Sequence, residues 1–284
     1  MNFLKRCFHL IFAEINMEMF IDKVVVISGG TDGIGKALVE EFLNKGAKVG
    51  TCSRTQEKLD ILAAQHLEKP LFTYMADVSK EEDCQKFIQA AIEKFGKIDI
   101  LINNAGISMR ALFRDTDLAT LKKVMDINFW GTVYCTKYGL ESILANKGSV
   151  VGVSSIAGYR VLPGRSGYSA SKFALNGWLE ALRTELLHTG VNVMWVCPGF
   201  TKSNIRNADL NHEAKAQGES PLEESKLMTS EECAHHIIKA IEKRKRTLVL
   251  TSTGKQTVFL NKFFPALADK LTYKFFFKDG KLKK

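Results

Sequence analysis

Strand-like and helix-like patterns alternate along almost the whole chain, and this alternation constrains the fold more than any other feature. Lys23–Ser28 is a β-branched apolar run, typical of a strand buried on both faces. Gly33–Lys45 follows with a helical apolar pattern that ends at Gly46. Further strands are expected at 47–52, 71–76, 98–103, 149–153, 192–196 and 247–250, and further helices at 56–66, 80–95, 118–145 (with an interruption), 168–187 and 230–243. This order predicts an α/β fold: a single Rossmann-like domain with a doubly wound, seven-stranded parallel sheet and helices on both faces.

The chain shows no internal repeat, low-complexity tract or interdomain linker, so residues 23–254 are expected to form one domain. With 284 residues, 45% of them hydrophobic, it can bury a sizeable core. Residues 200–229 interrupt the rhythm with a long, polar, weakly periodic stretch, which predicts a substrate lid or a disordered segment. Residues 255–284 follow the last expected strand as a basic, amphipathic C-terminal tail.

Residues 1–22 precede the first strand as an N-terminal extension. A basic start leads into an apolar run, as in a signal peptide, but Glu14 and Glu18 interrupt that run and it is too short to span a bilayer. We expect either an additional surface segment or a true start at Met17 or Met19.

The basic charge of the chain is concentrated in its tail. The net charge is +9, and residues 260–284 hold seven lysines against two aspartates, a net +5. Because the rest is only mildly basic and carries no RNA- or DNA-binding signature, nucleic acid is not an expected partner. The six cysteines are widely spaced, so we expect neither a disulfide framework nor a metal site, and a reducing, cytoplasmic setting. They are Cys7, Cys52, Cys84, Cys135, Cys197 and Cys233.

A glycine-rich loop joins the first strand to the first helix. Gly29, Gly33 and Gly35 lie in a G-x-x-x-G-x-G spacing. Glycine lets the backbone turn sharply and approach a pyrophosphate, and the helix N-terminus then offers free N–H groups and a positive dipole end. A tight strand–helix turn alone would also need glycine, but the position after the first strand of an alternating chain favours a dinucleotide site. The loop residues expected to contact the cofactor are Gly29, Thr31, Asp32, Gly33, Ile34 and Gly35.

The end of the second strand indicates which dinucleotide would bind. Where NAD-binding proteins have a carboxylate for the ribose 2′-hydroxyl, this chain has Ser53 and Arg54. Arg54 can pair with a 2′-phosphate, which favours NADP(H). The alternatives are that Arg54 is an exposed loop cation, and that Asp32 either caps the helix or lies near enough to repel that phosphate.

The motifs now match a family: the chain resembles the short-chain dehydrogenases/reductases from Lys23 to about Leu250. The matching motifs occur in the family's order and spacing, including the thirteen residues from Ser155 to Tyr168. They are the glycine loop, Asp77-Val78, Asn103-Asn104-Ala105-Gly106, Asn128, Ser155, Tyr168-x-x-x-Lys172 and Pro198-Gly199.

The resemblance implies a role for each motif in a catalytic domain. Tyr168 would be the acid/base, Lys172 its activator and a ribose ligand, Ser155 the hydroxyl partner of the substrate, and Asn128 the residue that organises a proton-relay water. For the cofactor it implies adenine contacts from Asp77 and Val78, contacts beside the adenosine from Asn104, Ala105 and Gly106, loop contacts from Pro198 and Gly199, and a contact near the carboxamide from Ser203. It also implies a homodimer or homotetramer.

The chemistry of these residue types agrees with the implied roles. Tyr168 and Lys172 are four residues apart on an expected helix, so they share one face. A tyrosine with the usual pKa of about 10 is a poor acid/base near neutrality, and a neighbouring ammonium favours its phenolate. An exposed ion pair contributes under about 1 kcal/mol, so the site must be partly desolvated. Ser155, at the end of the fifth expected strand, would lie at the ligand-binding edge and polarise a carbonyl.

The expected reaction is a hydride transfer between NADP(H) and a small-molecule carbonyl or alcohol. The loop residues that could face a substrate are mostly apolar, which suggests a lipophilic compound such as a steroid or a long-chain keto compound; ordinary packing is the alternative. These residues are Ile107, Met109, Tyr159, Val161, Leu162 and Phe200. The tail can lie on an anionic membrane, cover the active site or pack at a subunit contact.

Two other classes of function are compatible with parts of the sequence. A cofactor-sensing regulator without turnover would bind NADP(H) through the same loop, but such proteins usually lose the tyrosine, lysine or serine that this chain retains. A scaffold on a membrane surface would depend on the tail. Deletion of residues 255–284 separates this last alternative, since a reductase should keep its chemistry.

Overall fold

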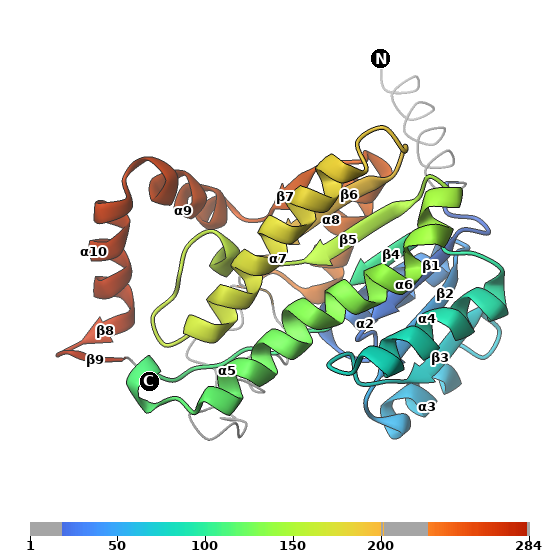
Figure 1. The fold of residues 1–284 in the computed structure, drawn as a ribbon, viewed down its shortest axis with the longest axis horizontal. Coiled ribbons are helices and arrows are strands. Elements are labelled where there is room, and N and C mark those ends of the chain that lie inside the picture. The colour runs from blue at the N-terminus through green and yellow to red at the C-terminus, as the bar shows by residue number, and fades with distance from the viewer. Residues whose placement is uncertain (1–18, 200, 202–226, 283–284) are drawn as a thin grey trace, which may run out of the picture.

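The computed structural model describes residues 19–199, 201 and 227–282, and a parallel sheet forms its centre (Figure 1). Within the described residues this sheet has seven strands in the order β3-β2-β1-β4-β5-β6-β7, all paired in parallel. The strands are β1 (Val24–Ser28), β2 (Lys48–Ser53), β3 (Leu71–Met75), β4 (Ile100–Asn103), β5 (Ser149–Val153), β6 (Asn192–Cys197) and β7 (Thr247–Val249). The predicted doubly wound α/β fold is confirmed.

Helices cover both faces of the sheet because alternate strand residues point to opposite sides. In β1, Val25 and Ile27 pack with α2 and α8, whereas Val24 and Val26 pack with α4, α6 and α7. These valines and the isoleucine are fully buried. The helices are α2 (Gly33–Asn44), α3 (Gln56–Ala64), α4 (Glu81–Phe95), α5 (Leu118–Met125), α6 (Gly131–Ala145), α7 (Ser166–Glu185) and α8 (Ser230–Glu242), with short turns η1 (Phe113–Asp115) and η3 (Ile156–Gly158).

The strand order places a crevice at the carboxyl edge of the sheet. The chain moves outward from β1 to β2 and β3, then returns to pair β4 against the other side of β1. Connections therefore diverge above the ends of β1 and β4, which is where ligands bind in open α/β sheets. Ser28 and Asn103 end these two strands and bring the glycine loop beside the Asn104–Gly106 segment.

The interruption expected within residues 118–145 is a π-helical turn, η2 (Asp126–Trp130), between α5 and α6. Such turns are rare in proteins, and those that occur are frequently found at functional sites. Asn128 lies in this turn and is buried. The sequence pattern indicated a break here but not its kind.

The tail differs from a single amphipathic helix. It begins earlier than expected, with α9 (Ser252–Phe263), continues as α10 (Pro265–Phe276) and ends in a hairpin of β8 (Phe277–Lys278) and β9 (Lys281–Leu282). Pro265 separates the helices, since proline suits the first position of a helix and not its interior. Figure 1 shows this pair of helices lying apart from the central sheet. We refer to residues 252–282 as the C-terminal arm.

Five cysteines fall within the described residues, and all are buried free thiols. Burial raises the pKa of the Cys52, Cys197 and Cys233 thiols to about 12. They are therefore protonated near neutrality and serve as packing groups. No helix in the described parts of the chain is long and apolar enough to cross a membrane.

Candidate active site

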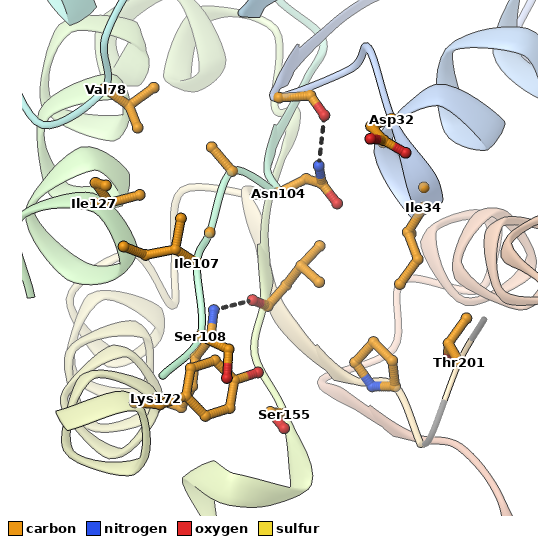
Figure 2. A pocket seen from close by; sticks show the side chains of 18 of the residues that line it. Asp32, Ile34, Val78, Asn104, Ile107, Ser108, Ile127, Ser155, Lys172 and Thr201 are labelled. Carbon is orange, nitrogen blue, oxygen red and sulfur yellow. Dashed lines mark hydrogen bonds between the residues drawn. The ribbon is translucent and has the colours of Figure 1, made fainter. Parts of the chain in front are cut away.

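A cavity of about 650 Å³ lies at the carboxyl edge of the sheet. Figure 2 shows Ser155 and Lys172 near one another at one end of it, with Asp32 and Ile34 across from Val78. Every described residue predicted to bind the cofactor lines this cavity. These residues are Gly29, Thr31, Asp32, Gly33, Ile34, Gly35, Ser53, Arg54, Asp77, Val78, Asn104, Ala105, Gly106, Tyr168, Lys172, Pro198 and Gly199. Ser203 and Phe200 lie outside the described residues.

The glycine loop forms a close-packed backbone turn at the N-terminus of α2. Gly29 and Gly33 have φ values of +73° and +51°, in the left-handed region that favours glycine. A Cβ at Gly35 would lie 2.1 Å from the carbonyl oxygen of Gly29, so this position admits no side chain. Asn104 Nδ2 donates to the carbonyls of Ser28 and Gly29, at 3.1 and 3.0 Å, and fixes the turn from the β4 side. This turn fits a pyrophosphate, because it brings backbone and a helix N-terminus to the cavity surface.

Asp32 stands at the N-cap position of α2, but its side chain makes no capping hydrogen bond. Its carboxylate instead lies 3.6 Å from Lys58 Nζ on α3. The capping alternative is therefore wrong. The lysine offsets the negative charge that could repel a phosphate at this end of the cavity.

Hydroxyl and basic side chains line the end of the cavity beyond β2. Thr31 Oγ1 donates to Ser53 Oγ at 3.1 Å, which joins the glycine loop to the end of the strand. Arg54 and Lys58 line the cavity next to them. Lys58 is not among the residues predicted from the sequence, because it lies on the helix that follows and not at the end of the strand. Its position in the first turns of the following helix, four residues after Arg54, is the signal that could have found it.

Lys172 is buried at the opposite end of the cavity. Its Nζ donates to the carbonyl oxygen of Val153 at 2.9 Å and lies 5.8 Å from the centre of the Tyr168 ring. Burial lowers the pKa of this amine to about 8. Tyr168 is 9% exposed and also lines the cavity. The expected shared face of α7 is thus confirmed, and the site is desolvated as the chemistry required.

Ser155 follows β5 in extended conformation, and its Oγ accepts a hydrogen bond from the Ala157 N–H at 3.1 Å. This bond holds the hydroxyl at the start of η3. Because the oxygen is the acceptor, the hydroxyl hydrogen can be donated to another group, such as a substrate carbonyl. Ser155, Tyr168 and Lys172 all line the cavity.

Asn128 occupies a different place from these three residues. Its side chain does not line the cavity; it accepts from Ile107 N at 2.8 Å and donates to Ile107 O at 2.9 Å and Ser171 Oγ at 3.0 Å. The amide therefore fixes the loop that contains Gly106 and Ile107. The water-organising role that the resemblance implies stays a prediction.

Only part of the expected apolar substrate wall faces the cavity. Ile107 and Leu162 line it, but Met109 is fully buried, Val161 is half exposed, and Tyr159 packs away with its hydroxyl accepting from Trp195 Nε1 at 2.9 Å. The loop pattern gave residue types but not side-chain directions. Lining residues that the sequence analysis missed include Ser108, Arg110, Pro163, Arg165, Thr201, Phe275 and Phe276. The two phenylalanines belong to the C-terminal arm, for which covering the active site was one of three alternatives.

A phosphate-type turn at one end of a cleft, and a buried lysine beside a tyrosine and a serine at the other, define an oxidoreductase that uses a nicotinamide cofactor. A family profile described as short chain dehydrogenase matches residues 23–214. The chain belongs to the short-chain dehydrogenase/reductase family.

Curated relatives span most of the chain. An 11-beta-hydroxysteroid dehydrogenase A from Arachis hypogaea is 34% identical over 265 residues, which cover 89% of this chain and 75% of that protein. The dehydrogenase/reductase SDR family member 7B of Xenopus laevis is 34% identical over 255 residues, 86% of this chain and 79% of that protein.

Solved structures share the fold. A Burkholderia phymatum short chain dehydrogenase/reductase in complex with NAD has a TM-score of 0.79 at 22% identity, covering 87% of this chain and 95% of that one. An alcohol dehydrogenase from Thermococcus sibiricus complexed with 5-hydroxy-NADP has a TM-score of 0.70 at 22% identity, covering 80% and 95%.

Proposed function

We propose that this protein is an NADP(H)-dependent oxidoreductase that interconverts a carbonyl and a secondary alcohol on a lipophilic substrate. The observation that carries the proposal is the cluster of Ser155, Tyr168 and Lys172. All three line the cavity, and Lys172 Nζ lies 5.8 Å from the centre of the Tyr168 ring. Figure 2 shows Ser155 and Lys172 on the side of the cavity away from Asp32 in the glycine turn. The nicotinamide ring, when bound, supplies or accepts the hydride.

The three side chains of the cluster handle the proton and the charge on oxygen. Ser155 donates its hydroxyl hydrogen to the substrate oxygen and orients it. Tyr168 gives its phenolic proton to that oxygen during reduction and takes it back during oxidation. Below its pKa of about 8, Lys172 is positively charged and stabilises negative charge on the tyrosine oxygen.

The preference for NADP(H) rests on the basic end of the cavity. Arg54 and Lys58 line it, and the ion pair with Lys58 compensates the one carboxylate of the glycine loop, Asp32. A 2′-phosphate would meet two cations and the hydroxyls of Thr31 and Ser53 there, which suits its charge and its acceptor oxygens.

Neutralising both cations should reverse the cofactor preference. For Arg54→Ala/Lys58→Ala we expect the ratio of kcat/KM for NADPH over NADH to fall by about 100-fold, since each charge-assisted contact contributes about 1.5–3 kcal/mol at most and part is screened. NADH values should change little. Lys86→Ala, an exposed lysine on α4, is the control. A wild-type preference for NADH would refute the assignment.

The lipophilic substrate is supported by the side chains at the catalytic end. Ile107, Leu162, Pro163, Phe275 and Phe276 line the cavity that also holds Ser155 and Tyr168, and several relatives carry names of hydroxysteroid dehydrogenases. A steroid-like or long-chain keto compound would bury apolar surface against these groups. Screening NADPH oxidation with lipophilic and polar ketones tests this, and exclusive turnover of polar ketones would contradict it.

We also propose that the protein is cytoplasmic and that its C-terminal arm contacts the anionic cytoplasmic face of a membrane. Phe259 and Phe263 on α9, and Leu267 and Leu271 on α10, are each 48–58% exposed. Lys262, Lys270 and Lys274 lie three residues after Phe259, Leu267 and Leu271, on the same helix faces. Residues 252–282 carry six lysines against two aspartates, so two copies of this face would repel one another, whereas anionic lipid would attract it.

Charge neutralisation on the arm should weaken this contact. Lys262→Gln/Lys270→Gln/Lys274→Gln should lower partitioning onto phosphatidylserine-containing vesicles by about 100-fold, from about 1 kcal/mol per lysine. Lys243→Gln/Lys245→Gln, two exposed lysines outside the arm, should leave it unchanged. A wild-type protein that stays in the soluble fraction of a flotation assay would contradict the membrane contact.

A further inference from the structure

We propose that Arg160 is a positioning residue that holds the C-terminal arm in place as a wall of the substrate site, and that this contact sets how well a large apolar substrate binds. The proposal rests on the proposed function for its substrate readout, but the contact itself can be tested without any substrate.

The Arg160 guanidinium bonds to both helices of the arm. Its Nη1 donates to Asn261 Oδ1 on α9 at 3.0 Å, and its Nε and Nη2 donate to Thr272 Oγ1 and Asp269 Oδ1 on α10 at 3.1 and 2.7 Å. The Arg160 side chain is only 13% exposed. One planar group therefore fixes the positions of the two helices relative to each other.

On the side of the catalytic domain, residues 159 and 160 connect the arm to the segment that follows Ser155 and to the central sheet. Arg160 lies five residues after Ser155, directly beyond η3. Asn261 Nδ2 donates back to the carbonyl oxygen of Tyr159 at 2.8 Å. The Tyr159 hydroxyl in turn accepts from Trp195 of β6. The arm is thus connected through residues 159 and 160 to the segment that positions Ser155.

The far end of the arm meets the same loop from the other side. Phe275 and Phe276 line the cavity together with Leu162 and Pro163. Leu282 packs on Gly164, where an added Cβ would lie 2.8 Å from Leu282 Cδ2. The loop between Ser155 and Tyr168 is therefore contacted at both ends by a single segment of chain.

The arm has little buried surface of its own to hold it. Gly254 is the one buried residue of α9, and Ala268 the one buried residue of α10. Segments with few buried apolar contacts open at low free-energy cost. The charge-assisted bonds of Arg160 consequently carry much of the attachment, and their loss should release Phe275 and Phe276 from the cavity.

Arg160→Met, which keeps the apolar stem but removes the donors, tests the contact. Amide hydrogen exchange across residues 252–282 should become at least about tenfold faster, as expected for the loss of one or more charge-assisted hydrogen bonds. Arg160→Lys should restore part of the protection. Arg244→Met is the control, since Arg244 donates to the backbone of Lys147 and Gly190 away from the arm. Unchanged exchange in Arg160→Met would overturn the proposal.

Kinetics with two ketones test the consequence for the substrate. With NADPH, the KM of Arg160→Met for a four-ring steroid ketone should rise by about tenfold or more, the effect of losing one aromatic contact with the substrate. The kcat, the KM for cyclohexanone and the Kd for NADPH should stay within about threefold, a change under 1 kcal/mol. Phe275→Ala/Phe276→Ala should reproduce this pattern with the arm still attached.

The outcomes separate the proposal from the proposed function. Faster exchange with an unchanged steroid KM would overturn the role of the arm as a substrate wall. If the wild type reduced cyclohexanone but no steroid ketone, the proposal that the arm forms a wall of the substrate site would be refuted. The proposal that the protein reduces carbonyl groups would stand. If the wild type reduced no ketone, the proposed function would fail, and hydrogen exchange would still decide whether Arg160 holds the arm.

Discussion

Tyr168→Phe is expected to lower kcat for ketone reduction by about 10²- to 10⁴-fold, the range that a positioned acid/base contributes. The substitution removes only the hydroxyl. The ring, which packs in a small cluster with Met109, Val124 and Ala157, would keep its place. NADPH affinity, measured by fluorescence titration, should therefore change by less than about threefold, which corresponds to under 1 kcal/mol.

Tyr138→Phe is the matched control for this experiment. The Tyr138 hydroxyl lies on the surface of α6 and donates to Glu81 at 2.7 Å, away from the cavity. Its loss should leave both kcat and NADPH binding unchanged. If Tyr168→Phe kept turnover within tenfold of wild type, the proposed mechanism would be refuted. Tyr168 is the only tyrosine of the described cluster of Ser155, Tyr168 and Lys172, so no other phenol there could replace it as the acid/base.

Gly35→Ala is expected to abolish measurable NADPH binding and to destabilise the fold. The new Cβ would meet the Gly29 carbonyl oxygen at 2.1 Å and Asn104 Nδ2 at 2.5 Å, so the turn and the β4 loop would have to separate. Overpacking of this kind costs about 1–3 kcal/mol, and here the displaced backbone is the proposed phosphate cradle. Isothermal titration and urea unfolding measure the two effects.

Gly177→Ala provides the contrasting case for the same change. Gly177 lies on the exposed side of α7, and an added Cβ there would meet nothing within 4 Å. Alanine should stabilise this helix by up to about 1 kcal/mol through its better helix propensity. If Gly35→Ala bound NADPH as tightly as Gly177→Ala, the glycine turn would not be the cofactor site.

Much of the site could be predicted because a parallel sheet gathers its strand ends at one edge. Ser28, Ser53, Asn103 and Val153 end four strands that are distant in sequence, yet the residues that follow them line one cavity. The position of each strand followed from local apolar runs, and the glycine turn from local spacing. Neither inference needed a long-range contact.

The residues that were missed depend on contacts between distant segments. Lys58 becomes relevant only because α3 turns its first residues back toward Asp32, and Phe276 only because the arm returns to the loop before α7. Neither a hydrophobic periodicity nor a sequence motif predicts such a contact between distant segments. Met109 and Tyr159 were expected to face the substrate but do not line the cavity, for a different reason. In irregular loops the side chains do not alternate in a fixed way, so the sequence does not give their direction.

The π-helical turn η2 has a consequence for the geometry of the rod formed by α5 and α6. An extra residue in one turn rotates everything after it by about 100° around the helix axis. Because of this rotation, α5 packs against α7 whereas α6 packs against α4. Deleting a single residue between Asp126 and Trp130 would undo it, pointing the apolar stripe of α6 toward water and withdrawing the Asn128 amide from Ile107. In this part of the chain, residue count matters as much as residue identity.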